Sequence, residues 1–162
     1  MSEGVQDGAV RHSVYMEEAL LEAKKAAAIG EVPIGAVVVR ADGEIIGRGY
    51  NQRETLKDPT AHAEVLALRE AALVYGDWRL TGCRLYVTVE PCVMCAGAIL
   101  LARVEEVVFG TLSPKGGALV STLSLYDIQG FNHYPRVCAG ILDDRCAMML
   151  ADFFSKRRRD KR

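Results

Sequence analysis

The sequence predicts an α/β domain of three layers, with helices on both faces of a mixed central sheet of about five strands. Helical and strand patterns follow one another in the order α-β-β-α-β-α-β, and a turn signal joins the first two strands. Strands that alternate with helices after a hairpin favour parallel pairing. The 162 residues suit one domain, so we expect a single domain over 1–162, with a flexible start at about 1–12.

The first half of the chain is predicted to form a helix, a hairpin and a second helix. Ser13 is a good N-cap for the first helix, and Gly30 is a good stop. The apolar, β-branched run 34–39 predicts a strand, and Asp42-Gly43 predicts a tight turn. A return strand at 44–50 and a helix at about 61–75 follow.

The second half predicts a strand at 85–89, a helix opened by Pro91 and a strand at 106–110. Residues 118–140 carry no readable pattern. A last helix has apolar residues at helical spacing, namely Cys146, Met149, Leu150, Phe153 and Phe154.

Composition favours a cytoplasmic protein with no membrane segment, and no protein partner is predicted. The five cysteines do not form a disulfide framework, which favours a reducing compartment. No signal peptide and no apolar run of membrane-spanning length is visible. Residues 156–162 form a basic tail with six cationic residues and one acidic residue, although the whole chain has a net charge of −1. This tail indicates either a polyanionic partner such as RNA or a solvated helix end.

Two short segments carry the candidate chemistry. His62 lies at the start of one predicted helix, and Cys92 and Cys95 lie at the start of the next. One nitrogen and two sulfurs suit Zn²⁺, and three protein ligands leave a tetrahedral position open for water, as in catalytic sites. Glu64 lies two residues beyond His62 and is the candidate proton shuttle.

Alternatives to a catalytic zinc site remain open. A Cys-x-x-Cys pair also occurs in redox centres and structural zinc sites. A closed structural site would need a fourth ligand, for which Cys83, Cys138 and His133 are candidates. Cys146 lies on the apolar side of the last helix, and His12 lies in the expected flexible start.

The pattern His62-Ala63-Glu64 with Pro91-Cys92-Val93-Met94-Cys95 resembles the metal signature of the cytidine/deoxycytidylate deaminase superfamily, a signature that is well known for base deaminases. The likeness spans roughly residues 14–158. It is most specific in the Pro-Cys-Val-Met-Cys-Ala-Gly-Ala stretch, which resembles the bacterial tRNA adenosine deaminase family. Val32-Pro33-Ile34-Gly35 and Phe131-Asn132-His133 resemble that family too.

The resemblance implies a cytidine-deaminase-like fold, one Zn²⁺ per subunit held by His62, Cys92 and Cys95, and Glu64 as the catalytic proton shuttle. It implies a homodimer that converts adenosine to inosine at the wobble position of a tRNA anticodon, acting on the anticodon stem-loop of an arginine tRNA. Substrate would be bound by the residues Asn51, Pro33, Ile34 and Ala63. The family's substrate loop often carries an acidic residue where Ser113 stands here.

Two further residues are candidate RNA contacts. Lys115 could meet a phosphate, although a solvated loop lysine is the common case. Phe153 or Phe154 could stack on a base, although burial in the core is the alternative. Two other functions stay open: deamination of a free nucleobase or nucleoside such as guanine or cytosine, and a non-catalytic zinc protein that binds RNA.

Overall fold

The computed structural model describes residues 2–161, and the side chains of 8–161. Five strands form one mixed sheet in the order β2-β1-β3-β4-β5. Its strands are β1 (Gly35–Val39), β2 (Ile45–Tyr50), β3 (Arg84–Val89), β4 (Glu106–Thr111) and β5 (Arg136–Ala139). β1 pairs antiparallel with β2 and β3, whereas β3, β4 and β5 are parallel. The predicted mixed sheet of about five strands is confirmed.

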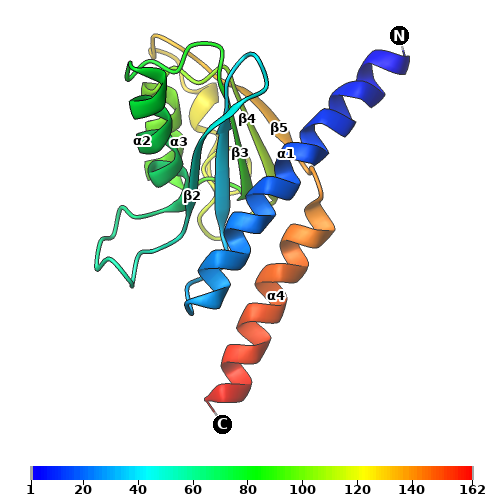
Figure 1. Cartoon of the computed structure of the whole chain (residues 1–162), viewed down its shortest axis with the longest axis vertical. Helices are drawn as coiled ribbons and strands as arrows, with labels where there is room; N and C mark the ends of the chain where they lie inside the picture. The colour runs from blue at the N-terminus through cyan, green and yellow to red at the C-terminus, as the bar shows by residue number, and fades with distance from the viewer. Residues whose placement is uncertain (1, 162) are drawn as a thin grey trace.

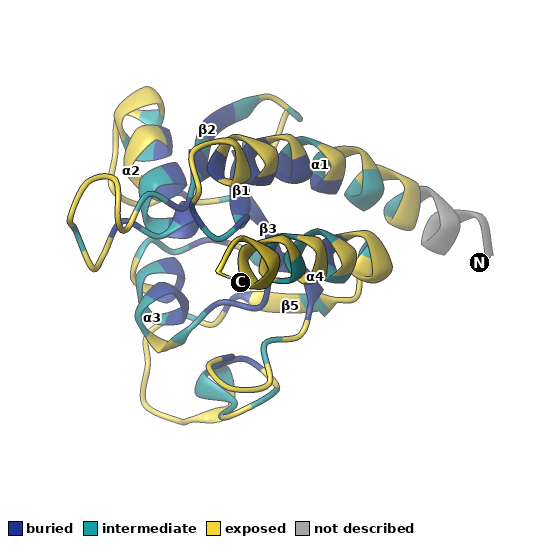
Figure 2. Ribbon diagram, turned by 90° about the horizontal axis from the view of Figure 1, so that it is seen from below, coloured by how far each residue is buried: buried dark blue, intermediate teal, exposed yellow. Residues whose placement is uncertain are grey.

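Helices cover both faces of this sheet, which confirms the three-layer prediction (Figure 1). The helices α1 (Ser2–Ala28) and α4 (Asp143–Asp160) lie on one face, and α2 (Ala63–Tyr75) and α3 (Val93–Leu101) lie on the other. Each helix turns its buried residues toward the sheet and its exposed residues outward (Figure 2). No helix among the described residues is long and apolar enough to cross a membrane.

The first helix begins earlier than its sequence signals predict. Ser13 lies inside α1, and its hydroxyl donates to the Ala9 carbonyl at 3.0 Å instead of capping a helix end. His12 is also held: its Nδ1 lies 2.8 Å from the Tyr86 hydroxyl, and its Nε2 lies 3.7 Å from Glu106. Residues 2–12, which the sequence predicts to be a flexible start, belong to α1, and His12 at the end of this stretch contacts the sheet. Met1 lies outside the described residues.

Two other expectations change in detail. Pro91 precedes α3 rather than opening it, and Cys92 is the N-cap. The unreadable stretch holds a short 3-10 helix, η1 (Leu125–Asp127), and the edge strand β5. β5 was not recognisable because it is short and mostly exposed, so it lacks an apolar pattern.

Glycines let the helices pack unusually close to the hairpin strands. A Cβ built on Gly47 would lie 2.3 Å from the Ala67 carbonyl oxygen, and one on Gly49 would lie 2.3 Å from that of Ala63. α2 therefore rests directly on the β2 backbone. Because Ala63 is the first residue of α2, this contact sets the position of the His62–Glu64 turn.

Candidate active site

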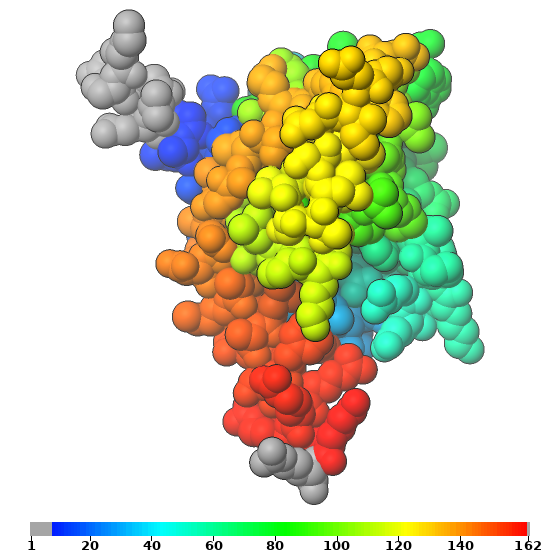
Figure 3. Space-filling view, turned by 180° about the vertical axis from the view of Figure 1, so that it is seen from behind, coloured from blue at the N-terminus to red at the C-terminus, as the bar shows by residue number. Residues whose placement is uncertain are grey.

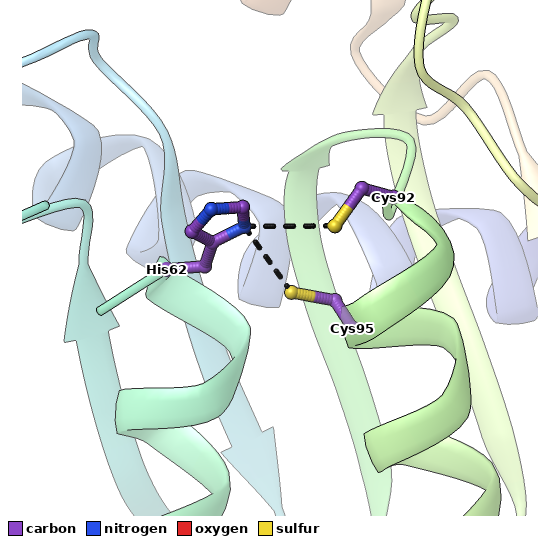
Figure 4. A group of neighbouring side chains, drawn as sticks. All are labelled: His62, Cys92 and Cys95. Atoms are coloured by element: carbon purple, nitrogen blue, oxygen red, sulfur yellow. Dashed lines mark hydrogen bonds between the residues drawn. The ribbon is translucent and has the colours of Figure 1, made fainter. Parts of the chain in front are cut away.

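Three side chains converge between the N-termini of α2 and α3 (Figure 4). His62 is the N-cap of α2, Cys92 is the N-cap of α3, and Cys95 lies in the first turn of α3. The His62 Nδ1 atom lies 3.6 Å from the Cys92 sulfur and 3.5 Å from the Cys95 sulfur. All three ligand atoms lie within 4.8 Å of one another.

These separations fit a zinc ion. A tetrahedral ion with Zn–S bonds of about 2.3 Å and Zn–N bonds of about 2.0–2.1 Å would hold nitrogen and sulfur about 3.5 Å apart. Of the two sulfurs, Cys92 favours thiolate, the form that binds metal, whereas hydrogen bonding with Cys92, followed by burial, raises the pKa of Cys95 above its usual value. Hydrogen bonding with Cys95, followed by that with His62, lowers the pKa of Cys92 to about 3.

The group contains three ligands among the described residues, which is the number found in catalytic zinc sites. The candidates for a fourth ligand lie elsewhere. Cys83 and Cys146 are buried in the two apolar clusters, and Cys138 packs beside the second. The His133 Nε2 atom lies 2.7 Å from the Val104 carbonyl oxygen. A closed structural site is therefore not formed by these side chains.

Glu64 lines the same pocket and is only 4% exposed. Burial raises the pKa of its carboxyl group to about 7. A carboxyl group in this range can both accept and release a proton at neutral pH.

The pocket beside the three ligands has a volume of about 170 Å³. That is enough for one base and is smaller than the roughly 300–1,000 Å³ typical of drug-sized ligand sites. Of the predicted substrate-binding residues, Ile34, Asn51 and Ala63 line it, whereas Pro33 is buried and is not part of the lining. The Asn51 side chain donates to the Val32 carbonyl at 3.2 Å and accepts from the Arg53 amide at 3.2 Å, so it holds this side of the pocket together.

The two candidate RNA contacts lie outside the pocket lining. Lys115 is exposed in the loop whose Ser113 and Gly116 form part of the wall. Phe153 lies on α4, on the other face of the sheet, and lines a groove with Lys24 and Met149. Phe153 is partly buried and Phe154 is 43% exposed, so the last helix buries less of its apolar stripe than its spacing predicts.

Sequence reasoning assigned no role to four lining residues, Arg53, Val89, Glu90 and Gly116, of which Arg53 and Glu90 are charged. Arg53 follows Asn51 by two residues and lies at the exposed rim. Glu90 ends β3 directly before the Pro91-Cys92 pair and is 4% exposed. Burial opposes its ionisation, but hydrogen bonds from Ser121 and Val120 outweigh burial and hold the pKa of Glu90 below its usual value. The available signal was a charged residue at the end of a buried strand.

Comparison with known proteins gives consistent results. Residues 9–111 match the family model of the cytidine and deoxycytidylate deaminase zinc-binding region. The tRNA-specific adenosine deaminase of Bacillus subtilis is 52% identical over 149 residues, which cover 92% of each chain. A structure from a study of A-to-I editing by tRNA:A34 deaminases at the wobble position is 44% identical, with a TM-score of 0.81, covering 84% of this chain and 98% of that one.

The fold is shared with deaminases of free bases as well. The guanine deaminase of Nitrosomonas europaea is 25% identical, with a TM-score of 0.76, covering 87% of this chain and 83% of that one. A guanine deaminase structure from Bacillus subtilis is 43% identical, but it covers only 62% of this chain and 64% of its own, with a TM-score of 0.59. The tRNA-specific adenosine deaminase of Bacillus subtilis matches at 52% identity over 92% of each chain, and this combination of identity and coverage decides between the two groups. This chain belongs to the cytidine and deoxycytidylate deaminase family and, within it, to the tRNA-specific adenosine deaminases.

Proposed function

We propose that this protein is a zinc-dependent hydrolase that converts adenosine to inosine in tRNA, at the wobble position of the anticodon, with an arginine tRNA as substrate. The observation that carries the proposal is the set of His62, Cys92 and Cys95 beside a pocket for one base, with Glu64 buried in the same pocket. The high identity to tRNA-specific adenosine deaminases supports the choice of substrate.

The reaction replaces the amino group at C6 of adenine with oxygen from water and releases ammonia. His62, Cys92 and Cys95 would hold the zinc ion, which would supply the Lewis acidity that makes water nucleophilic at neutral pH. Glu64 takes a proton from the attacking water and delivers it to N1 of the ring. It then takes the second proton from the hydroxyl group added at C6 and transfers it to the departing amine, which leaves as ammonia. Asn51 has two N–H groups, of which one is donated to Val32. We assign the other to the substrate nucleoside.

The anticodon loop would approach the end of the molecule where the pocket opens. The cationic residues Lys156–Arg159 at the end of α4 are exposed. In Figure 3, this helix end projects at the same end of the molecule as the loop around 113–117. Exposed cations near a base pocket suit an RNA backbone, and an unstacked anticodon base can enter without breaking a base pair.

We also propose that the protein is a homodimer that contacts its partner through α3. Val93 and Leu101 are 59% and 65% exposed, and a Cβ on Gly97 would meet no atom within 4 Å. These positions are four residues apart, so they form one apolar stripe beside the metal ligands. We place the reaction in the cytoplasm, because all five cysteines are free thiols.

The decisive experiment incubates the zinc-loaded protein with an anticodon stem-loop RNA bearing adenosine at the wobble position, with inosine as the readout. Parallel reactions contain free guanine, free cytosine and a stem-loop with adenosine at another position. Inosine at the wobble position alone supports the proposal, whereas turnover of a free base alone contradicts it. X-ray absorption of bound zinc separates the non-catalytic alternative, which requires four protein ligands.

A further inference from the structure

Glu90 is a buried carboxylate that the proposed chemistry does not use. It lies in the pocket wall, yet it contacts no described cation in any ion pair of the structure. Its side chain is occupied instead by the segment 113–121, which follows β4. This pattern calls for an explanation, because burying a carboxylate is costly unless it is well hydrogen-bonded.

Five donors of the 113–121 segment point to the two oxygens of Glu90. Oε2 accepts from the amides of three consecutive residues, Leu119, Val120 and Ser121, at 3.1, 2.8 and 2.9 Å. Oε1 accepts from the Ser113 amide at 3.1 Å and from the Ser121 hydroxyl at 2.5 Å. Consecutive amides that converge on one oxygen form an anion-binding nest.

The segment has few other ties to the body of the protein. It contains neither helix nor strand, so no ladder of backbone bonds supports it. Its Ala118 amide donates to the Pro91 carbonyl at 2.9 Å, and Ala118 and Leu119 are buried. The carboxylate is therefore the main polar anchor of the segment.

Gly117 allows the segment to pass over this carboxylate. A Cβ at Gly117 would lie 2.2–2.4 Å from the three carboxyl atoms of Glu90. Only glycine permits this approach, because any other residue would place its Cβ on the carboxyl group. The segment therefore has a glycine at the position where a side chain would clash with Glu90.

The consequence concerns the substrate pocket. Ser113 and Gly116 of the segment line the pocket together with Ile34 and Asn51. Glu90 precedes the metal ligand Cys92 by two residues. One side chain thus links the wall of the pocket to the helix that carries two of the metal ligands.

We infer that Glu90 is a positioning residue that holds the 113–121 segment as a preformed wall of the substrate pocket and thereby sets affinity for the RNA. This inference rests on the proposed function. A wall that must be ordered at each binding event weakens affinity, whereas a preformed wall does not. The chemistry of Glu64 would be little affected.

The test compares Glu90→Gln with the wild-type sequence. Both are made in a zinc-loaded Glu64→Ala background, so that binding of the wobble-adenosine stem-loop is measured without turnover. Replacing one acceptor oxygen by an amide group opposes up to three of the N–H donors. We expect a Kd for RNA about tenfold higher, an unchanged zinc content, and faster amide exchange confined to 113–121. With Glu64 present, KM should rise by a similar factor while kcat changes less than about threefold.

Two further variants keep the inference open to refutation. Gly117→Ala displaces the segment while leaving the carboxylate intact, and should raise the Kd in the same way even if Glu90→Gln fails to fold. Glu22→Gln is the matched control, since Glu22 is 2% exposed but pairs with Lys25 and Arg48 away from the active-site pocket. It should leave the Kd unchanged.

The outcomes separate this inference from the proposed function. If the wild-type protein makes inosine but Glu90→Gln and Gly117→Ala both bind RNA normally, the inference is wrong and the function stands. Unaltered amide exchange at 113–121 in Glu90→Gln would also overturn it. If the wild-type protein makes no inosine, the proposed function fails, while amide exchange still decides whether Glu90 holds the segment.

Discussion

Glu64 combines burial with a place beside the metal ligands, and these two properties suit it to proton transfer. It lies in the first turn of α2, two residues beyond His62. Its carboxyl group is nearly inaccessible to bulk water, so a proton it accepts is passed to a bound ring rather than to solvent. This role is independent of metal binding, because Glu64 is not among the three ligands.

Glu64→Ala should therefore retain zinc and fold but lose activity. General acid–base catalysis contributes about 10²–10⁴-fold, so kcat for inosine formation should fall by about that factor. Zinc stoichiometry and thermal unfolding are measured on the same sample. Glu70→Ala, at an exposed position of the same helix, is the control and should be unchanged. Normal turnover in Glu64→Ala would remove this residue from the mechanism.

At the scale of single elements, the approach of α2 to β2 decides where the site is. The strand has glycine at 47 and 49, and the helix has alanine at the facing positions 63, 67 and 71. Small residues on both sides allow the helix backbone to touch the strand backbone. The turn that carries His62 and Glu64 is thereby placed close to the N-terminus of α3.

Gly49→Ala should push this helix away from the sheet. The added Cβ would lie 2.3 Å from the Ala63 carbonyl oxygen and 2.7 Å from the Ala67 amide, both of which are backbone atoms that cannot rotate away. We expect a loss of about 1–3 kcal/mol in the free energy of unfolding, together with weaker zinc binding, measured by urea unfolding and zinc titration.

Gly8→Ala is the matched control for this substitution. Gly8 lies in α1 and a Cβ there meets no atom within 4 Å. It should be neutral or stabilising by about 0.5–1 kcal/mol, because alanine loses less backbone entropy in a helix. Equal free energies of unfolding for Gly49→Ala and the wild type would contradict the prediction that a Cβ at this close contact destabilises the fold.

The end of α4 is the second element with a separable role. Deleting residues 156–162 removes the exposed cations at the end of α4. It also removes Arg162, which lies outside the described residues. The fold should not change, whereas RNA affinity should fall, and the slope of log K against log salt should become shallower by about 0.7 for each lost phosphate contact. Filter binding between 50 and 200 mM salt measures both. Unchanged affinity and slope would mean that the tail only increases solubility.

At the scale of the whole molecule, a bound ion would join two crossovers of the sheet. His62 comes from the helix that follows the hairpin, and both cysteines come from the helix between β3 and β4. A metal held by all three ties these helices together in the folded state only, so binding free energy adds to stability.

Removal of zinc should therefore destabilise the protein. At a free zinc concentration about 1,000 times the Kd, binding contributes about 4 kcal/mol, which corresponds to a loss of about 10 °C in Tm for a chain of this size. Calorimetry with and without a chelator measures this difference. His62→Ala should show a much smaller response to the chelator, and a Tm of the wild type that is independent of zinc would contradict the prediction.

The exposed stripe of α3 predicts association of two copies. Leu101→Glu places a charge at one end of that apolar surface, at its most exposed apolar side chain, so it should shift the sedimentation coefficient from that of a dimer toward that of a monomer. Val10→Glu, at a 64% exposed position of α1 on the other face of the sheet, is the control. A monomeric wild-type protein would contradict the proposed dimer.

Local signals in the sequence were sufficient for the fold class and for the three residues that form the candidate metal site. The Asp42-Gly43 turn, the β-branched run of β1 and the helical stretch of α2 depend on neighbours in the chain, so pattern alone reveals them. The spacing of Cys92 and Cys95 likewise places both sulfurs at one helix end. The basic tail and Glu64 were visible for the same reason, although their roles remain predictions.

Only the tertiary structure decided the features that depend on distant partners. Ser13 resembles a helix start, yet α1 continues through it and His12 reaches Tyr86, 74 positions away in the chain. The sequence of β5 lacks an apolar pattern, and the strand forms because β4 offers it a free edge. In the sequence, Glu90 appears only as a neighbour of the Pro91-Cys92 pair. The five groups that donate hydrogen bonds to its carboxylate lie 23 to 31 residues further along. The periodicity of apolar residues indicates which side of a single helix or strand is buried. Contacts across the sheet depend on how the helices and strands pack against one another, so periodicity does not predict them.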